Sequence, residues 1–242
     1  MRPFEAQLRE GSADMSVMLD DAQIVRLLDY LELIEKWNKV YNLTAVRDPA
    51  EMLTHHLLDS LAVIAPLRSK LIGLCAQDEA QGGGASRFRD SRTGLLDVGS
   101  GAGLPGVVIA ICCPEIWVDC VDTVAKKAAF IRQVAVTLAL PNLRALHARV
   151  ENLSDRYDVI SSRAFASLAD FTRWSSKALA QHGVWLAMKG KYPADEIAGL
   201  PTDVAVFHVE QLAVPGLDAA RCVVWMRKVS QLQKSVRWKD LP

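Results

Sequence analysis

Cysteine is scarce in this 242-residue chain, and its spacing argues against metal chemistry. The sequence contains five cysteines and no Cys-x-x-Cys pair, and none lies near a histidine at the spacing of zinc ligands. An odd number in apolar surroundings indicates reduced, buried thiols. We therefore expect no disulfide framework, no metal site and a reducing compartment.

Long hydrophobic runs and an export signal are also missing. The longest apolar run, residues 107–113, is far shorter than the roughly 20 residues that span a bilayer. The first residues mix charged and apolar side chains and lack the apolar core of a signal peptide. These features predict a soluble, cytoplasmic protein with no membrane partner.

The chain has no excess charge of either sign, because 28 Lys and Arg balance 28 Asp and Glu. A strong basic footprint for nucleic acid is thus absent. The charge is uneven, however: residues 1–60 hold 6 basic and 11 acidic residues, which leaves 22 and 17 for the rest. This bias permits an RNA partner without establishing one.

Two amphipathic helices are expected near the N-terminus. Apolar side chains recur at three- and four-residue steps across residues 24–41 and again across 53–64, ending before Pro66. Residues 77–93 include the run QGGGAS, which cannot pack or propagate a helix, and we interpret them as a flexible insertion. The predicted organisation is an N-terminal helical extension (1–76), this insertion (77–93), a main domain (94–230) and a basic tail (231–242).

Short apolar strands alternate with helices from residue 95 onward. We predict strands at 95–98, 117–121, 143–147, 157–161, 183–188, 204–209 and 222–227, and helices at 105–113, 125–140, 168–179 and 194–200. Repeated strand-helix units are typical of a parallel sheet covered by helices, and the closely spaced final strands indicate an antiparallel edge. The sequence predicts an α/β, Rossmann-like domain with a seven-stranded sheet.

The first predicted strand runs directly into a glycine-rich loop, DVGSGAGLPG at residues 97–106. In open parallel sheets, ligands bind at the carboxyl ends of the strands where the strand order reverses. Glycines there allow a tight turn and let a ligand touch the backbone. Gly99 and Gly101 are therefore candidate ligand contacts.

Two carboxylates near this loop indicate which nucleotide it holds. Asp122 lies about 20 residues on, at the end of the second strand, where it would accept hydrogen bonds from the ribose of NAD or of S-adenosylmethionine. Asp97 precedes the first glycine by two residues, and a carboxylate there would repel a pyrophosphate. S-adenosylmethionine carries a sulfonium cation and an amino group instead. Asp97 therefore favours the methyl donor over NAD.

A third candidate contact region follows the third strand, at residues 148–152. In this fold the corresponding loop packs against the adenine, so Val150 is expected to lie on the ring. Glu151 in the same loop is either a ligand contact or an ordinary surface charge.

Several separated motifs resemble the glucose-inhibited division protein B family. They are LLDVGSGAGLPG at 95–106, WNKVYNLT at 37–44, HLLDS at 56–60, SRAFASL at 162–168 and KG at 189–190. The resemblance runs from about residue 27 to residue 227, and only the insertion and the basic tail depart from the compact family pattern.

This resemblance implies a class I S-adenosylmethionine-dependent methyltransferase that acts on guanine N7 of small-subunit (16S) ribosomal RNA. It implies contacts to the methyl donor from Gly99, Leu104, Val150, Glu151 and Arg163, with Asp122 on the ribose. The expected cofactor is S-adenosylmethionine and the expected partner is small-subunit ribosomal RNA. We further expect a monomer.

The residues themselves agree with guanine N7 as the target. Methyltransferases that act on exocyclic amines usually carry Asn/Asp-Pro-Pro-Tyr/Phe after the fourth strand, where this chain has SSRAF at 161–165. Methylation at pyrimidine C5 needs a cysteine nucleophile, often after proline, and the sequence has no Pro-Cys pair. Guanine N7 has an exposed lone pair and needs no general base. Positioning then carries the catalysis, and no catalytic residue is assigned.

Five side chains near the predicted site each have more than one interpretation. Arg163 ends the fourth strand, where it would bond the donor's carboxylate, the RNA or a surface acid. Lys189 and Arg149 are either contacts to RNA phosphates or solvated surface residues. His56 is a candidate substrate contact, although a hydrogen-bonded structural histidine is the favoured interpretation. Phe165 fits a core residue better than a base-stacking one.

Two other function classes stay open at this point. The glycine loop and Asp122 also fit an NAD-dependent oxidoreductase of Rossmann type, against which Asp97 and the lack of an acid/base pair argue. A binding module that holds the donor without turnover would have the same sequence features. A comparison of the thermal shifts caused by S-adenosylmethionine and by NAD distinguishes a methyltransferase from an oxidoreductase. A methyl-transfer assay distinguishes a methyltransferase from a binding module.

Overall fold

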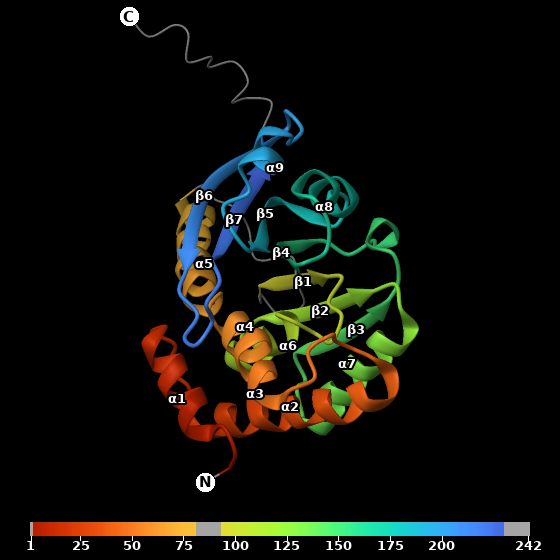
Figure 1. Ribbon diagram of the computed structural model, residues 1–242. Helices are drawn as coiled ribbons and strands as arrows, with labels where there is room; N and C mark the ends of the chain where they lie inside the picture. Colours follow the sequence, from red (N-terminus) through yellow and green to blue (C-terminus); the bar gives the residue numbers. More distant parts are fainter. Residues whose placement is uncertain (1, 81–92, 230–242) are drawn as a thin grey trace, which may run out of the picture.

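The computed structural model describes residues 2–80 and 93–229, which are built around a seven-stranded sheet (Figure 1). The strands are β1 (Gly94–Val98), β2 (Trp117–Asp122), β3 (Leu143–His147), β4 (Tyr157–Arg163), β5 (Leu179–Lys189), β6 (Val204–Leu212) and β7 (Arg221–Lys228). Their order is β3-β2-β1-β4-β5-β7-β6. Strands β1 to β5 are parallel, whereas β7 is antiparallel to both β5 and β6. The predicted α/β, Rossmann-like fold with an antiparallel edge is confirmed.

Helices cover both faces of the sheet (Figure 1), which explains why its central strand β1 is buried along its whole length. The helices that follow β1 are α6 (Gly106–Cys112), α7 (Ala125–Thr137), α8 (Leu168–Ser175) and α9 (Ala194–Ala198). All residues of β1 are buried, and neighbours along it point to opposite faces. Leu95 joins the core shared with α6, α7 and the N-terminal helices, whereas Leu96 joins the core beneath α8.

The N-terminal extension is helical and packs against one face of the sheet domain, where α2 contacts α6 and α7 (Figure 1). Its elements are α1 (Glu5–Asp14), α2 (Asp21–Tyr41), α3 (Pro49–Met52), the π-helical η1 (Leu53–Leu58), α4 (Asp59–Leu61) and α5 (Ile64–Ala80). The helix expected at residues 24–41 is confirmed as the larger part of α2. Helix α1 was not among the expected elements.

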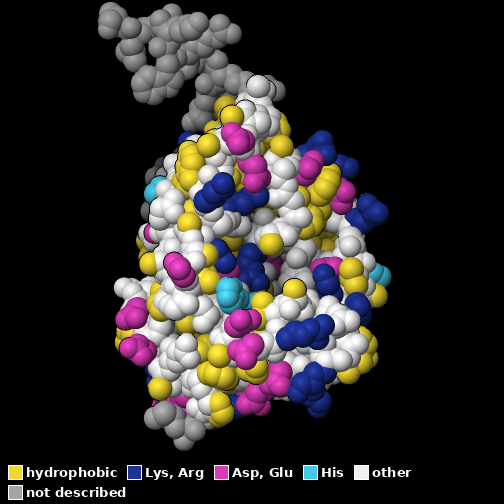
Figure 2. All heavy atoms as spheres, in the orientation of Figure 1, with side chains coloured by type: hydrophobic (Ala, Val, Ile, Leu, Met, Phe, Trp, Pro, Cys, Tyr) yellow, Lys and Arg dark blue, Asp and Glu magenta, His cyan; other side chains and the backbone are white. Residues whose placement is uncertain are grey.

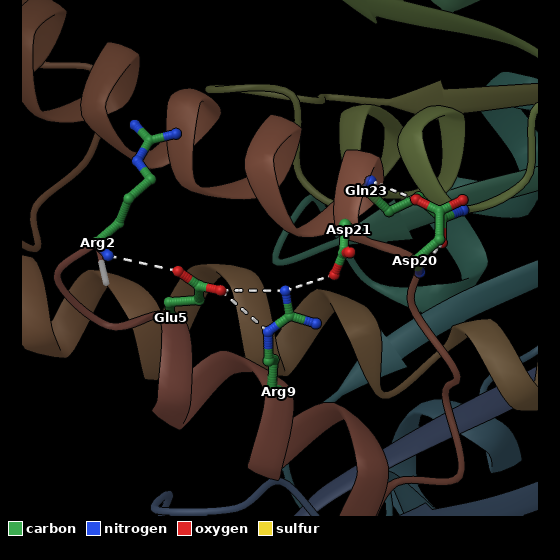
Figure 3. A network of polar contacts seen from close by, with 6 residues as sticks. All are labelled: Arg2, Glu5, Arg9, Asp20, Asp21 and Gln23. Carbon is green, nitrogen blue, oxygen red and sulfur yellow. Dashed lines mark hydrogen bonds and ion pairs between the residues drawn. The ribbon is translucent and has the colours of Figure 1, made fainter.

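Polar contacts at the start of α1 and of α2 hold these two helices together (Figure 3). Asp20 caps α2 by accepting from the Gln23 amide, and the Gln23 side chain accepts from the Asp20 amide. Arg9 of α1 bonds Glu5 in its own helix and reaches Asp21 at 2.7 Å. Gln23 Nε2 also donates to the last carbonyls of α6, so the same corner is tied to the sheet domain.

The helix expected at residues 168–179 is wrong at its C-terminal end. Helix α8 stops at Ser175, because Leu179 already pairs with Tyr157 in the sheet. Strand β5 accordingly begins at Leu179 rather than at residue 183, and a register shift follows Tyr157.

The helix expected to end before Pro66 is wrong as well. Residues 49–61 form three short helical pieces, and a new helix, α5, begins at Ile64. Pro66 lies in the first turn of α5, where its missing amide costs no helical hydrogen bond. Helix α5 extends to Ala80, so the first residues of the expected insertion at 77–93 are helical.

The rest of that insertion, from residue 81 to residue 92, lies outside the described residues, and so does the basic tail at 231–242. The division into domains at residues 76, 93 and 230 stays a prediction.

Thiols and carboxylates in the described ranges form no obvious metal centre. Cys112, Cys113, Cys120 and Cys222 are free and buried, as expected, and burial raises the pKa of the Cys113 thiol to about 11. Within residues 2–80 and 93–229, no three His, Cys, Asp or Glu side chains come together as metal ligands. In the same ranges, no helix has both the length and the apolar character that a membrane crossing needs.

Candidate active site

The loop after β1 has a backbone that requires glycine. Gly99, Gly101 and Gly103 have φ angles of 67°, 60° and 94°, a region that L-residues with side chains disfavour. A Cβ atom on Gly99 would lie 2.2 Å from Cδ2 of Phe165, so this glycine also lets an aromatic ring approach the backbone. The predicted tight turn at the end of the first strand is therefore present.

Asp97, in β1, is hydrogen-bonded to both ends of this loop. Its buried carboxylate accepts hydrogen bonds from the Gly106 amide at 3.1 Å and from Ser161 Oγ at 2.9 Å. Ser100 Oγ in turn donates to the Asp97 carbonyl at 2.7 Å. Burial raises the pKa of the Asp97 carboxyl to about 6. Both carboxylate oxygens are engaged with the protein, and direct contact with the donor's cationic groups stays a prediction.

Tyr30 of α2 fixes the loop from the side of the N-terminal extension. Its fully buried hydroxyl donates to the Ala102 carbonyl at 2.6 Å. The sequence analysis missed this residue. In the sequence, Tyr30 lies beside Leu31, a member of the apolar stripe of α2, and is not part of that stripe. A hydroxyl group next to the buried face of the helix was the only feature of the sequence that could have pointed to a role for it. The extension thus helps to shape the site as well as covering the sheet.

Asp122 lies at the end of β2, as the strand pattern predicts. Its Oδ2 accepts from the Gly101 amide at 3.0 Å, and its Oδ1 accepts from the Val124 amide at 2.8 Å. Lys127 Nζ lies 3.8 Å from the same Oδ2. The side chain is almost completely buried, so these contacts hold its carboxylate in one place at the carboxyl end of the sheet.

A first cavity, of about 370 Å³, opens beside Asp122. Four residues predicted to contact the donor line it together, among them Asp122, predicted for the ribose, and Val150, predicted for the adenine; the other two are Gly99 and Glu151. Arg149 also lines this cavity; its side chain is exposed and bonds no other described residue. Val150 is buried in the short helix η3 (Val150–Asn152), so its apolar side chain has a fixed position on the cavity wall.

A second cavity, of about 520 Å³, lies on the other side of the loop. The predicted site residues Gly99, Gly101, Leu104, Arg163, Lys189 and His56 line it. Gly99 and Ala164 line both cavities, so the two spaces adjoin at these residues. Every predicted site residue except Asp97 lines one of these two neighbouring spaces.

Phe165 forms part of the boundary between the cavities and the core. Its ring packs on Gly99 and lies edge-on to Phe171 and Trp174, with centroids 6.4 and 5.8 Å away. These contacts fit the expected core role, and the ring also lines the smaller cavity.

His56 has the structural role that the sequence favoured. Its Nε2 lies 2.9 Å from Thr44 Oγ1, and the side chain is buried. Burial and, to a smaller extent, the charge of Arg163 lower the pKa of the imidazole to about 4. His56 is therefore uncharged at neutral pH, and it lines the larger cavity as a neutral side chain.

Lys189 is less free than a phosphate-binding lysine would be. Its ammonium donates to the Ala166 carbonyl at 3.0 Å and pairs with Glu196 at 2.8 Å. Glu196 also accepts from the Leu168 amide at 2.7 Å. Lys189 thus holds the segment between β4 and α8 that follows the shared wall residue Ala164. Contact with RNA stays a prediction for both Lys189 and Arg149.

Arg163, at the end of β4, is joined to two residues that the sequence analysis did not single out. Its Nη1 donates to Asp59 Oδ2 at 2.7 Å and to the His55 carbonyl at 2.9 Å. Arg221, the first residue of β7, donates from Nε to Asp59 Oδ1 at 2.7 Å. Asp59 belongs to the HLLDS motif, but its partners Arg163 and Arg221 are distant in sequence, and only the folded structure shows that they bond it.

Comparison with known proteins identifies the family. The model of the family described as "rRNA small subunit methyltransferase G" matches residues 23–74 and 82–224. This chain belongs to that family. The protein "Ribosomal RNA small subunit methyltransferase G" of Albidiferax ferrireducens is 68% identical over 94% of this chain and 99% of its own length. Proteins of the same name from Acidovorax sp. (strain JS42) and Methylibium petroleiphilum are 65% and 56% identical, covering 94% and 93% of this chain and 96% and 97% of their own lengths.

The family match confirms the resemblance that the separated motifs predicted, because the family model is that of the glucose-inhibited division protein B group. The chain is a class I methyltransferase in fold and a methyltransferase in family, and S-adenosylmethionine is the cofactor that this membership implies. An NAD-dependent oxidoreductase is not favoured. Solved structures are more distant: TrmN from Thermus thermophilus is 22% identical over 57% of this chain and 44% of its own, with a TM-score of 0.47.

Proposed function

We propose that this protein transfers the methyl group of S-adenosylmethionine to N7 of a guanine in small-subunit ribosomal RNA. The observation that carries the proposal is the pair of cavities that meet at Gly99 and Ala164, one beside Asp122 and the other beside Arg163. A donor laid across the loop has its two ends in different spaces and its reactive centre at their junction. The relatives' name supplies the RNA class.

The residues of both cavities fit an extended donor molecule. In this arrangement Asp122 would hold the ribose hydroxyls, Val150 would lie against the adenine, and Arg163 would bond the amino-acid carboxylate. Gly99 and Gly101 line the larger cavity with backbone that has no side chain. When bound, S-adenosylmethionine supplies an electrophilic methyl group on a sulfonium centre.

Guanine N7 suits this site because its lone pair is available without removal of a proton. The protein then needs to bring the base into line with the methyl group, which is a positioning task. His56 is neutral and engaged with Thr44, and the Asp97 carboxylate is buried beneath the loop. These side chains support a rigid wall for an incoming base in the larger cavity.

A transfer assay with the purified protein tests the proposal. Protein, tritiated S-adenosylmethionine and small-subunit ribosomal RNA, either naked or as the assembled subunit, are incubated and the RNA is digested to nucleosides. We expect label in N7-methylguanosine, and none with a Gly101→Val variant. Label in another nucleoside would refute the N7 assignment. Binding of the donor without transfer to either RNA form would indicate a binding module.

A monomer in the cytoplasm is the form in which we propose that the protein acts. The predicted site residues of a single chain already lie together around the two cavities. Light scattering of the purified protein, alone and with the donor analogue S-adenosylhomocysteine, should give the mass of one chain. A dimer mass would contradict this part of the proposal.

A further inference from the structure

A buried carboxylate joins two arginines that come from distant parts of the chain. Asp59 lies on α4, Arg163 ends β4 and Arg221 begins β7. Each guanidinium bonds a different oxygen of Asp59, and both distances are 2.7 Å. The Asp59 side chain is only 5% exposed, whereas those of Arg163 and Arg221 are 19% and 23% exposed and line the 520 Å³ cavity.

Part of each guanidinium is still available to a ligand. Asp59 and the His55 carbonyl use Nη1 of Arg163, while Asp59 and the Ala220 carbonyl use Nε and Nη1 of Arg221. Within residues 2–72 and 93–229, whose side chains the structure describes, Nε and Nη2 of Arg163 and Nη2 of Arg221 have no hydrogen-bond partner. The planar fork of an arginine matches a carboxylate or a phosphate.

The charge of this cluster favours anions. Two arginines share one carboxylate, so the cluster has a net charge of one positive unit, and Lys189 nearby is already balanced by Glu196. Figure 2 shows Lys and Arg side chains lying beside a His side chain near the middle of the face in view. The donor has a single carboxylate, which one arginine satisfies. The other arginine is left for a second anion.

We propose that Arg221 binds a phosphate of the RNA backbone next to the target guanine, and that Asp59 is the positioning residue that sets Arg221 relative to Arg163. This inference rests on the proposed function. Arg163 is the arginine for the donor, because it directly precedes Ala164, where the two cavities meet. Arg221 bonds the other oxygen of Asp59 and, like Arg163, lines the larger cavity, where the base and its phosphate would enter.

Asp59 is suited to this role because it fixes both guanidiniums at once. Without its charge, two arginines would face each other across a partly buried space, and each would turn away. Asp59→Asn keeps the size of the side chain but removes the charge and one acceptor. We therefore expect this variant to weaken donor binding and RNA binding together, through the two arginines that Asp59 holds.

The test compares donor binding with RNA binding in matched variants. Equilibrium dialysis measures labelled S-adenosylmethionine, and filter binding measures a small-subunit ribosomal RNA transcript at several salt concentrations. Arg221→Ala should weaken RNA binding at least about tenfold and reduce the salt slope by about 0.7 to 0.9. Its donor affinity should not change. Arg221→Lys should restore the slope, because the charge returns.

Arg144→Ala is the matched control. Arg144 also bonds a buried aspartate, Asp119, but both lie toward the amino ends of their strands, at the opposite end of the sheet from the loop. This variant should leave donor affinity and the RNA salt slope unchanged. Asp59→Asn should lower both affinities more than the control does. A result for Asp59→Asn equal to the control would overturn the positioning role.

Two further outcomes decide the assignment of Arg221. If Arg221→Ala lowers donor affinity and leaves the salt slope intact, the second anion is the donor's carboxylate and the inference is wrong. If Asp59→Asn does not fold, a double-mutant cycle of Arg163→Ala and Arg221→Ala replaces it, with catalytic efficiency as the readout. Non-additive effects of the two substitutions would support Asp59 as the residue that positions both arginines, and additive effects would overturn that role.

These measurements separate the inference from the proposed function. Binding is measured whether or not a methyl group is transferred. If the wild-type protein binds donor and RNA and shows the Arg221 effects but methylates no guanine, only the proposed function fails. If it methylates N7 and Arg221→Ala binds RNA with the wild-type slope, only the inference fails.

Discussion

The Gly101 amide donates a hydrogen bond to Asp122 Oδ2 at 3.0 Å, which joins the glycine loop to the end of β2. The sequence places these residues 21 positions apart, and the parallel pairing of β1 with β2 brings them together. Asp122 therefore orders the loop in addition to facing the smaller cavity. In the proposed donor site, this one carboxylate would both order the loop and bind the ribose.

Asp122→Asn should weaken donor binding at least about tenfold, because the single oxygen of asparagine cannot accept from both the Gly101 and the Val124 amides, and the charge proposed to bind the ribose is lost. Isothermal titration calorimetry with S-adenosylhomocysteine measures the change. Asp155→Asn is the control, because Asp155 is a half-exposed aspartate that pairs only with Arg144. Equal affinities for the two variants would show that Asp122 does not hold the donor.

Gly101→Val should abolish donor binding while the protein stays folded. At Gly101 a Cβ atom meets only the Gly99 carbonyl, at 3.9 Å, so the protein has room but the cavity loses space. The φ angle of 60° adds strain of about 1–2 kcal/mol. Calorimetry measures donor binding and circular dichroism measures folding. Normal donor binding by a folded variant would show that the donor lies elsewhere.

Asp97→Asn should change how stability depends on pH. The folded-state pKa of Asp97, about 6, is raised above the ordinary value of 3.8. Its contribution to stability is therefore fully present below pH 3.8 and is lost as the pH rises through 6. Relative to the variant, the wild type should lose on the order of 3 kcal/mol across this interval. Urea unfolding from pH 3.5 to pH 7.5 measures both proteins.

His56 must be considered in the same pH range, because its shift has the opposite sign. The folded-state pKa of about 4 is below the ordinary value of 6.5, so its contribution is present above pH 6.5 and is lost as the pH falls. Both proteins in the Asp97 comparison contain His56, and the difference between them isolates Asp97. A difference that does not vary from pH 4 to pH 6 would mean that Asp97 has an ordinary pKa.

Arg149→Ala should reduce the salt slope of RNA binding by about 0.7 to 0.9, because an exposed, unpaired cation is removed. Lys189→Ala should change the slope less, since Glu196 already balances this charge. Arg156→Ala is the control, because this exposed arginine lies just before the amino end of β4. The expectation for Arg149 fails if its variant and the Arg156 variant have the same slope.

The fold was largely predictable because its strands are short apolar runs separated by helical periodicity. Parallel strands buried on both faces give a strong signal, and the buried pattern of β1 is an example. The end of α8 was not predictable in this way. Leu179 continues the apolar pattern of the helix, and only its pairing with Tyr157 shows that it belongs to the sheet.

The donor half of the site was predictable for a related reason. Gly99, Asp122 and Val150 follow successive strands, and the carboxyl ends of parallel strands meet at one edge of the sheet. Asp59 and Arg221 follow no such rule. They lie on α4 and on the antiparallel strand β7, and tertiary packing alone places them beside Arg163.

Mapping of N7-methylguanosine in small-subunit ribosomal RNA tests the central claim most directly. The RNA is taken from cells with the gene, without it, and without it but complemented by the wild-type or the Gly101→Val protein. We expect one guanine to carry the N7-methyl group only where an active protein is present. Equal methylation with and without the gene at every guanine would contradict the account.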